Sequence, residues 1–212
     1  MKDKGGFDLI AAGWAGLSGT DRIVRAHAEA LKTRFPNSYI REIEAACRLY
    51  PETEEKLKDL AERGILSAWE PAAECPAGTA FGSSVQESPA GIAFLFPAGE
   101  GGIFAALWKM AEALGTGLSV QLRRIPVRQE TVEVCEWLDL HPYMLESRGM
   151  ALLVTSSAAE VLDLMESEGV HASLIGRTAK GNDRVLHIDD RVMYLTRPQP
   201  DELRKVLKRQ TR

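Results

Sequence analysis

The stretch Ala98-Gly99-Glu100-Gly101-Gly102-Ile103 runs directly into the apolar sequence Phe104-Ala105-Ala106-Leu107-Trp108-Lys109-Met110. A glycine-dense turn that opens a helix leaves unpaired backbone N–H groups at the positive end of the helix dipole. This arrangement predicts an anion site, and a phosphate-bearing ligand would suit it. The alternative is a tight strand-to-helix connection that holds no ligand, because a glycine turn alone is a weak motif.

The residues on either side of this turn predict a βα unit. Gly91 to Phe96 has the apolar character of a buried strand, and Gly102 to Leu114 has the length and composition of a helix. Upstream, the segment from Glu70 to Ala90 is crowded with proline, glycine and serine and shows no clear period. We expect a flexible loop there, near residues 70–90, acting either as a lid or as a disordered connection.

The rest of the chain alternates between strand and helix patterns. In the first part we expect a strand at Phe7 to Ala12, a glycine loop at 13–19, and mostly helix from there to Gly64, with Thr20 as a helix cap, a break before Pro36, a second helix from Asn37 or Ser38 and a third from Pro51. In the second part we expect strands at Leu118 to Leu122, Met150 to Thr155, Ala172 to Arg177, Val185 to Ile188 and Met193 to Leu195, and helices at Gln129 to Leu138, Ala158 to Glu168 and Asp201 to Lys208.

Helices interleaved with strands and followed by a terminal antiparallel pair predict an α+β, layered α/β fold, in which helices cover a mixed β-sheet. The 212 residues, of which 45% are hydrophobic, are enough to bury one core. We therefore expect residues 7–212 to form one domain behind a linker-like N-terminus at 1–6.

Charge and cysteine content exclude several classes of protein. The 26 basic and 30 acidic residues are mixed along the chain and give a net charge of −4, so neither nucleic acid nor an anionic membrane is an expected partner. Cys47, Cys75 and Cys135 are odd in number and far apart, which fits neither a disulfide framework nor a zinc site. The apolar run near the N-terminus is too short for a signal peptide or a membrane span. A cytoplasmic location is expected.

Several short motifs, in order, carry a family resemblance over nearly the whole chain. They are Gly13-Trp14-Ala15-Gly16-Leu17-Ser18-Gly19-Thr20, Gly101-Gly102-Ile103, Leu107-Trp108, Gly117-Leu118, the run from Ile125-Pro126-Val127 to Thr131, His141-Pro142-Tyr143, Ser147, Gly149 and Ala172 to Arg177. Together they resemble the C-terminal domain of aminoimidazole ribonucleotide (AIR) synthase-related, PurM-like proteins. The resemblance is closest to the hydrogenase-maturation carbamoyl dehydratase (HypE-like) branch.

The resemblance implies ATP-dependent chemistry, but three departures from the family weaken that implication. Members of this family are two-domain enzymes that transfer phosphate from ATP, and their N-terminal domain supplies most metal ligands; the expectation is that only the C-terminal domain is present here. Where the family commonly has His-Asp-x-Thr before the paired glycines, this sequence has Phe96-Pro97-Ala98-Gly99. The C-terminal cysteine of the hydrogenase-maturation enzyme is also missing from the final residues 208–212. No catalytic residue and no metal ligand are predicted, and the resemblance does not decide whether the chain is an enzyme.

The other candidate side chains favour structural roles. His27, His141, His171 and His187 show no metal-ligand spacing, and Cys135 lies in an apolar helix. Arg123, Arg124 and Arg128 form either a phosphate contact or a solvated basic edge. Trp69, beside the flexible loop, is a candidate anchor for a partner.

Two functions are compatible with these observations. The favoured one is a stand-alone, non-catalytic domain that binds a phosphorylated small molecule or a protein partner. The other is one half of an ATP-dependent synthetase or hydrogenase-maturation-type enzyme, active only with a separate N-terminal-domain partner protein. ATP and magnesium are the cofactors that the resemblance implies, and a homodimer is expected if an apolar face is left uncovered. The predicted binding residues are Gly16, Gly19, Thr20, Gly99, Glu100, Gly101, Gly102 and Arg128.

Overall fold

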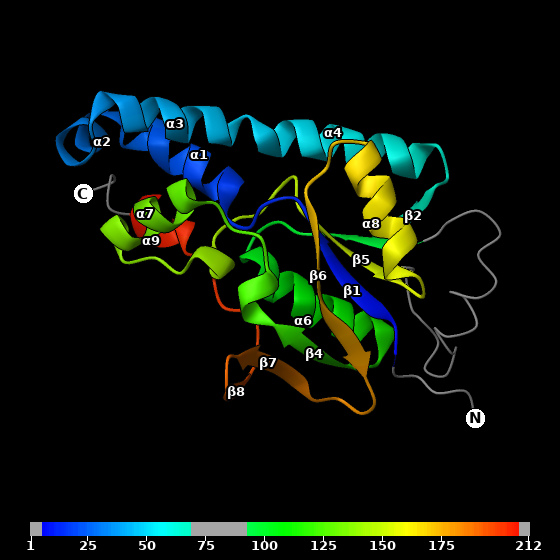
Figure 1. Ribbon diagram of the computed structural model, residues 1–212. Helices are drawn as coiled ribbons and strands as arrows, with labels where there is room; N and C mark the ends of the chain where they lie inside the picture. The colour runs from blue at the N-terminus through cyan, green and yellow to red at the C-terminus, as the bar shows by residue number, and fades with distance from the viewer. Residues whose placement is uncertain (1–5, 69–92, 208–212) are drawn as a thin grey trace.

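The computed structural model describes residues 6–68 and 93–207, which contain an eight-stranded mixed sheet with the strand order β2-β3-β5-β1-β6-β4-β7-β8. Figure 1 shows how the sheet runs through the molecule with helices on both sides. The strands are β1 (Asp8–Ala12), β2 (Leu66–Ala68), β3 (Ala93–Pro97), β4 (Gly117–Gln121), β5 (Ala151–Thr155), β6 (Ala172–Ala179), β7 (Arg184–Ile188) and β8 (Arg191–Tyr194).

The pairing of the strands is mostly antiparallel. Strand β1 lies between β5 and β6, with Ile10 opposite Leu153 on one side and opposite Leu174 on the other. Among the strands of residues 6–68 and 93–207, only β2 with β3 and β4 with β7 pair in parallel, and β7 and β8 form the expected hairpin at the end of the sheet. The α+β fold with a mixed sheet is thereby confirmed.

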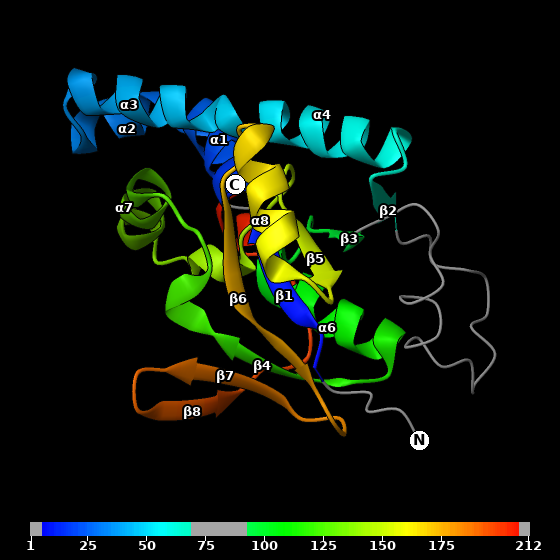
Figure 2. The same cartoon turned by 45° about the vertical axis from the view of Figure 1, so that its right-hand side comes forward.

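Helices cover both faces of the sheet and also form a layer beyond one end of it (Figures 1 and 2). The helices are α1 (Leu17–Ala26), α2 (Ala28–Arg34), α3 (Asn37–Cys47), α4 (Leu49–Glu62), α6 (Gly102–Leu114), α7 (Gln129–Leu138), α8 (Ala158–Ser167) and α9 (Leu203–Leu207), with 3-10 turns η1 (Leu122–Arg124) and η2 (Pro142–Met144). Helices α1, α2, α3, α7 and α9 share their own apolar cluster, which includes Leu17, Ile43 and Val134.

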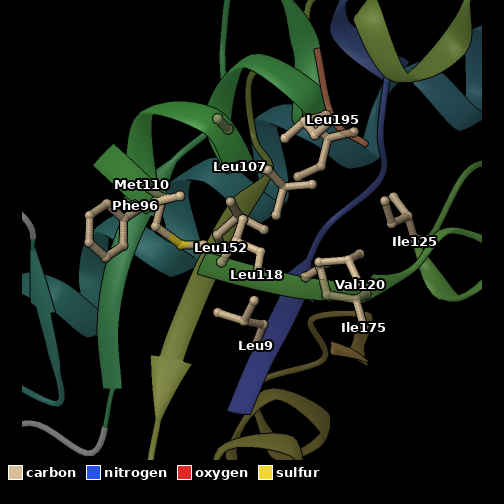
Figure 3. Packing of buried hydrophobic residues seen from close by; sticks show 14 of the residues in the cluster. Leu9, Phe96, Leu107, Met110, Leu118, Val120, Ile125, Leu152, Ile175 and Leu195 are labelled. Atoms are coloured by element: carbon tan, nitrogen blue, oxygen red, sulfur yellow. The ribbon is translucent and has the colours of Figure 1, made fainter. Parts of the chain in front are cut away.

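The alternation of side chains along β1 assigns each face of the sheet to different helices. Leu9 and Ala11 join α6 in one cluster of buried residues, whereas Ile10 and Ala12 join α8 and α4 in another. Figure 3 shows the first cluster, in which Leu107 and Met110 of α6 meet strand residues such as Leu118 and Leu152. Because α6 packs on one face of the sheet, the glycine turn that begins this helix lies at the end of β3.

The structure corrects several expected boundaries. Thr20 does not cap the first helix, because α1 begins at Leu17 and its N-cap residue is Gly16. The expected single helix before Pro36 is broken at His27 into α1 and α2. Helix α4 begins at Leu49 rather than at Pro51, and strand β2 was not anticipated. The expected loop at 70–90, with Trp69 and Cys75, lies outside the described residues.

A cation–π contact fastens β7 to α6. The guanidinium carbon of Arg184 lies 3.8 Å from the centre of the Trp108 ring. We expect Arg184→Met, which keeps an unbranched apolar stem, to lower the free energy of unfolding by about 1 kcal/mol. Chemical denaturation measures this loss. Arg34→Met is the control, because Arg34 lies 5.2 Å from the smaller Phe35 ring, and an equal loss in both variants would contradict the prediction.

No helix within residues 6–68 or 93–207 combines the length and the apolar character that a membrane crossing requires.

Candidate functional site

Two helices begin at the same place, on either side of the segment from His141 to Gly149. Helix α1 starts after Gly16 and α6 after Gly101, and both glycines have left-handed backbones, with φ of 72° and 81°. The amide of Gly19 donates to the carbonyl oxygen of Glu146 at 3.0 Å, and the amide of Ser147 donates to the carbonyl oxygen of Gly99 at 3.1 Å. We call this meeting point, formed by residues 16–20, 99–102 and 142–148, the junction.

Close packing explains why the junction contains so many glycines. A Cβ atom on Gly102 would lie 2.4 Å from the carbonyl oxygen of Tyr143 and 2.7 Å from that of Leu145. A Cβ atom on Gly19 would lie 2.4 Å from the Leu145 side chain, and one on Gly16 would lie 2.9 Å from a backbone oxygen. These glycines therefore let the 142–148 segment pass between two helix starts, whether or not a ligand binds.

A carboxylate of the chain itself occupies the anion position at the glycine turn. Asp201 Oδ2 accepts the amide of Gly101 at 2.7 Å, and Oδ1 accepts the amide of Leu203 at 2.8 Å. The amide of Glu146 also bonds Asp201, whose exposed fraction is 4%. Burial raises the pKa of Asp201, and the three backbone bonds oppose that rise. The turn that begins α6 is thus built to hold a negative charge.

Arginines line the pocket next to Asp201. The buried carboxylate of Glu146 pairs with Arg22 at 2.5 Å and with Arg148 at 2.7 Å, while Arg204 pairs with Glu100. The side chains of all three arginines are more than half exposed. They border a cavity of about 250 Å³ that also contacts Asp201 and Leu203. This junction pocket therefore has cations at its rim, and its lining includes the Asp201 carboxylate, which covers the Gly101 amide; guanidinium groups and helix-start amides are groups that bind phosphate.

Seven of the eight predicted binding residues lie in the junction and the eighth lies apart, but of the eight only Glu100 lines the junction pocket. Gly16, Gly19, Thr20 and Gly99 to Gly102 all belong to the junction, although the Thr20 hydroxyl is used within α1, where it donates to the Gly16 carbonyl oxygen. Arg128 instead binds both carboxylate oxygens of Glu130, at 3.0 and 2.8 Å, and lies over the Trp14 ring. It does not line the junction pocket.

The residues that complete the pocket were not predicted from the sequence. Asp201 lies 100 residues after Gly101, and Arg204 lies 104 residues after Glu100. Nothing in the local sequence of Asp201 or Arg204 marks them as partners of a glycine turn. Arg22, Glu146 and Arg148 are single charges on a helix and a loop. Of these five residues, only Asp201 carries a local signal, because aspartate is a common cap at the start of a helix and α9 begins at Leu203.

The Arg128–Glu130 pair predicts a pH dependence of stability. The two hydrogen bonds from Arg128 hold the pKa of Glu130 below its ordinary value of 4.5, against the opposing effect of burial. A lowered pKa in the folded state adds stability above the unfolded pKa and loses it as the pH falls through the folded pKa. We expect Glu130→Gln to be less stable than the unmodified protein by about 1 kcal/mol at neutral pH, with the difference shrinking below pH 4.5.

Denaturation curves recorded across this pH range test the prediction. Glu136→Gln on the same helix is the control, because Glu136 is exposed. A difference that stays constant down to the acid limit would contradict the role given to the Glu130 charge.

Besides a cavity of about 430 Å³ beside Lys56 and Asp59, two still larger cavities lie away from the glycine turn. One of about 710 Å³ is lined by Trp14, Arg123, Arg124 and Tyr143, among others, next to the stacked rings of Trp14 and His171. The other, of about 660 Å³, lies among α1 to α4. Within residues 6–68 and 93–207, no group of three or more histidine, cysteine or acidic residues could hold a metal ion. The cavity among α1 to α4 has the carboxylate of Asp21 in its lining, but that carboxylate accepts hydrogen bonds from the side chains of Arg25 and Tyr50 rather than from the backbone of a helix start.

Comparison with known proteins shows which family and which proteins this chain resembles in sequence. Residues 98–189 match the family described as AIR synthase related protein, C-terminal domain. Carbamoyl dehydratase HypE of Rhodobacter capsulatus is 35% identical over 81 residues, which are 36% of this chain and 24% of that protein. The sequence resemblance to this C-terminal domain, in its HypE branch, is confirmed.

Solved structures share the fold over most of the chain. The crystal structure of E. coli HypE, a hydrogenase maturation protein, has a TM-score of 0.59 at 20% identity and covers 93% of this chain and 51% of its own. The crystal structure of hydrogenase maturation protein HypE in complex with ATP has a TM-score of 0.59 at 15% identity, and the match covers 93% of this chain and 52% of that structure. The chain spans about half the length of these structures.

Proposed function

We propose that this chain, which resembles the AIR synthase-related C-terminal domain of HypE, binds a phosphorylated small molecule in the junction pocket. The observation that carries this proposal is the position of Asp201. Its buried carboxylate accepts the amide of Gly101 at the start of α6, which is where a phosphate oxygen would be held. A ligand would take this place on the Gly101 amide by displacing the Asp201 side chain.

The rim of the pocket supports a phosphate rather than a carboxylate ligand. A phosphate group carries more charge and more acceptor oxygens than a carboxylate, so it can bond the Gly101 amide and arginines together. Arg22 and Arg148 are held in place by Glu146, and Arg204 by Glu100. An incoming phosphate would compete with these carboxylates for the same guanidinium groups.

The residues around the pocket favour binding over catalysis. The strand that leads to the turn ends in Phe96 and Pro97, which offer neither a carboxylate nor a hydroxyl to orient a reacting group. Rate enhancement needs charges positioned for the transition state, and Phe96 and Pro97 at this end of the strand supply none.

Calorimetric titration tests the proposal. The probes are inorganic phosphate, ATP with magnesium, and a panel of phosphorylated sugars and nucleotides. We expect saturable binding of at least one of them, and weaker binding to the double variant Arg22→Gln, Arg148→Gln. Arg63→Gln is the control, because Arg63 pairs with Asp59 and Glu168 outside the pocket. No heat and no thermal stabilisation with any probe would overturn the proposal.

A second candidate function is one half of an ATP-dependent enzyme that works with a protein partner. The observations in its favour are that similar structures include a HypE–HypF complex and a HypE complex with ATP. ATP hydrolysis by the chain, alone or with an added N-terminal domain of a HypE protein, would support this function. Binding of phosphorylated ligands without turnover in either mixture supports the first.

A further inference from the structure

Strand β8 presents an uncovered edge at the end of the sheet. It pairs with β7 on one side, and in the strand order it has no neighbour on the other (Figure 2). Its residues Val192, Met193 and Tyr194 are 60%, 44% and 65% exposed, and they are the large hydrophobic residues that stand exposed in the described part of the chain. An exposed apolar edge strand is a template for pairing with another strand.

The hydrogen-bond pattern shows which backbone groups are free along this edge. The amide of Leu195 donates to the carbonyl oxygen of Arg184, its opposite residue, so this is a hydrogen-bonded pair. Such pairs alternate along an antiparallel ladder, which makes Met193 with Leu186 the next one. Val192 and Tyr194 therefore turn their N–H and C=O groups away from β7, toward the open edge.

We propose that a second copy of this chain pairs with β8 in antiparallel orientation, with Met193 on the two-fold axis. In this register Val192 of each copy lies opposite Tyr194 of the other, and their outward N–H and C=O groups form four hydrogen bonds. The two Met193 residues face each other as a non-hydrogen-bonded pair. A two-fold axis requires this self-complementary pairing, because the same strand supplies both sides.

Charge complementarity favours a second copy over an unrelated strand. The exposed Asp190 lies at one end of β8, beside Asp189, which already pairs with Arg123 at 2.6 Å, and the exposed Arg197 lies just beyond the other end. Antiparallel pairing about Met193 brings Arg197 of each copy to the acidic end of the other. The apolar side chains also match, because Val192 and Tyr194 project from one face of the strand and would pack across the axis on their counterparts.

Sedimentation of the full chain over a range of concentrations measures the self-association. We expect a monomer–dimer equilibrium, and we expect Val192→Pro to raise the dimer dissociation constant by about tenfold or more, because proline removes one outward N–H from each copy. Val192→Thr is the control that keeps the N–H and should retain the dimer. A monomer at all concentrations, or a dimer that Val192→Pro leaves unchanged, would overturn the proposal.

Disulfide trapping tests the register. In a Cys75→Ser background, Met193→Cys should oxidise to a covalent dimer, since non-hydrogen-bonded pairs bring their Cα atoms to about 4.5 Å, within the range of a disulfide. Cys47 and Cys135 should not interfere, because both are buried and burial raises the pKa of each thiol to about 12. In this register residue 192 of one copy lies opposite residue 194 of the other, not opposite residue 192. A variant that carries Val192→Cys alone, or Tyr194→Cys alone, should therefore cross-link far less. Faster cross-linking at either position than at 193, or capture of a different chain instead, would contradict the two-fold at Met193.

Discussion

Replacing Gly102 with alanine is expected to lower the free energy of unfolding by about 3 kcal/mol or more. Two costs add at this position. The backbone has a φ of +67°, which a residue with a Cβ atom adopts only with strain. The new Cβ would also lie 2.4 Å from the carbonyl oxygen of Tyr143 and 2.7 Å from that of Leu145, so the main chain would have to move. Denaturant unfolding followed by circular dichroism measures the loss.

Gly115→Ala separates the two costs. Gly115 ends the same helix with a φ of +60°, but no atom lies within 4 Å of the position its Cβ would take. Only the backbone strain applies there, and we expect a loss of about 1 kcal/mol. Equal losses in the two variants would mean that the 142–148 segment does not press on the start of α6.

The second large effect is expected for Asp201→Ala, which should lose about 3 kcal/mol of stability at neutral pH. The substitution leaves the amides of Gly101, Leu203 and Glu146 without their carboxylate acceptor in a site that is almost fully buried. A buried donor without a partner costs more than the net gain of forming the bond. The variant also leaves space at the positive end of α6.

Inorganic phosphate or sulfate should restore part of the stability that Asp201→Ala loses. An anion that binds only the folded state raises the melting temperature with its concentration. Glu202→Ala is a matched control, since Glu202 is the next residue, has an exposed fraction of 5% and pairs with Lys205 rather than with the glycine turn. If phosphate stabilises both variants equally, the effect is general and the anion position at Gly101 is not responsible.

Local signals in the sequence predicted the βα unit correctly. Helix α6 spans Gly102–Leu114 and α7 spans Gln129–Leu138, as expected, because each has an apolar pattern and α6 has a left-handed glycine at both ends. The start of α1 was wrong because Gly16, with no side chain, serves as its N-cap, whereas Thr20 has the side chain that usually does so.

The site depends on contacts that a local pattern cannot reveal. Asp201 reaches the Gly101 amide because the chain returns from β8 past the start of α6, and α9 joins α1 in one apolar cluster. The glycines indicated an anion site, but their sequence did not show that a carboxylate of the chain already fills it. Arg128 was grouped with them although its neighbour Glu130 binds it locally.

The most direct test of the anion site follows the Gly101 amide by NMR while inorganic phosphate is added to Asp201→Ala. We expect a saturable shift of the Gly101 signal, while the amide of Gly115, at the other end of α6, stays unchanged. A Gly101 amide that does not respond, or phosphate binding that shifts only signals elsewhere, would contradict an anion site at this turn.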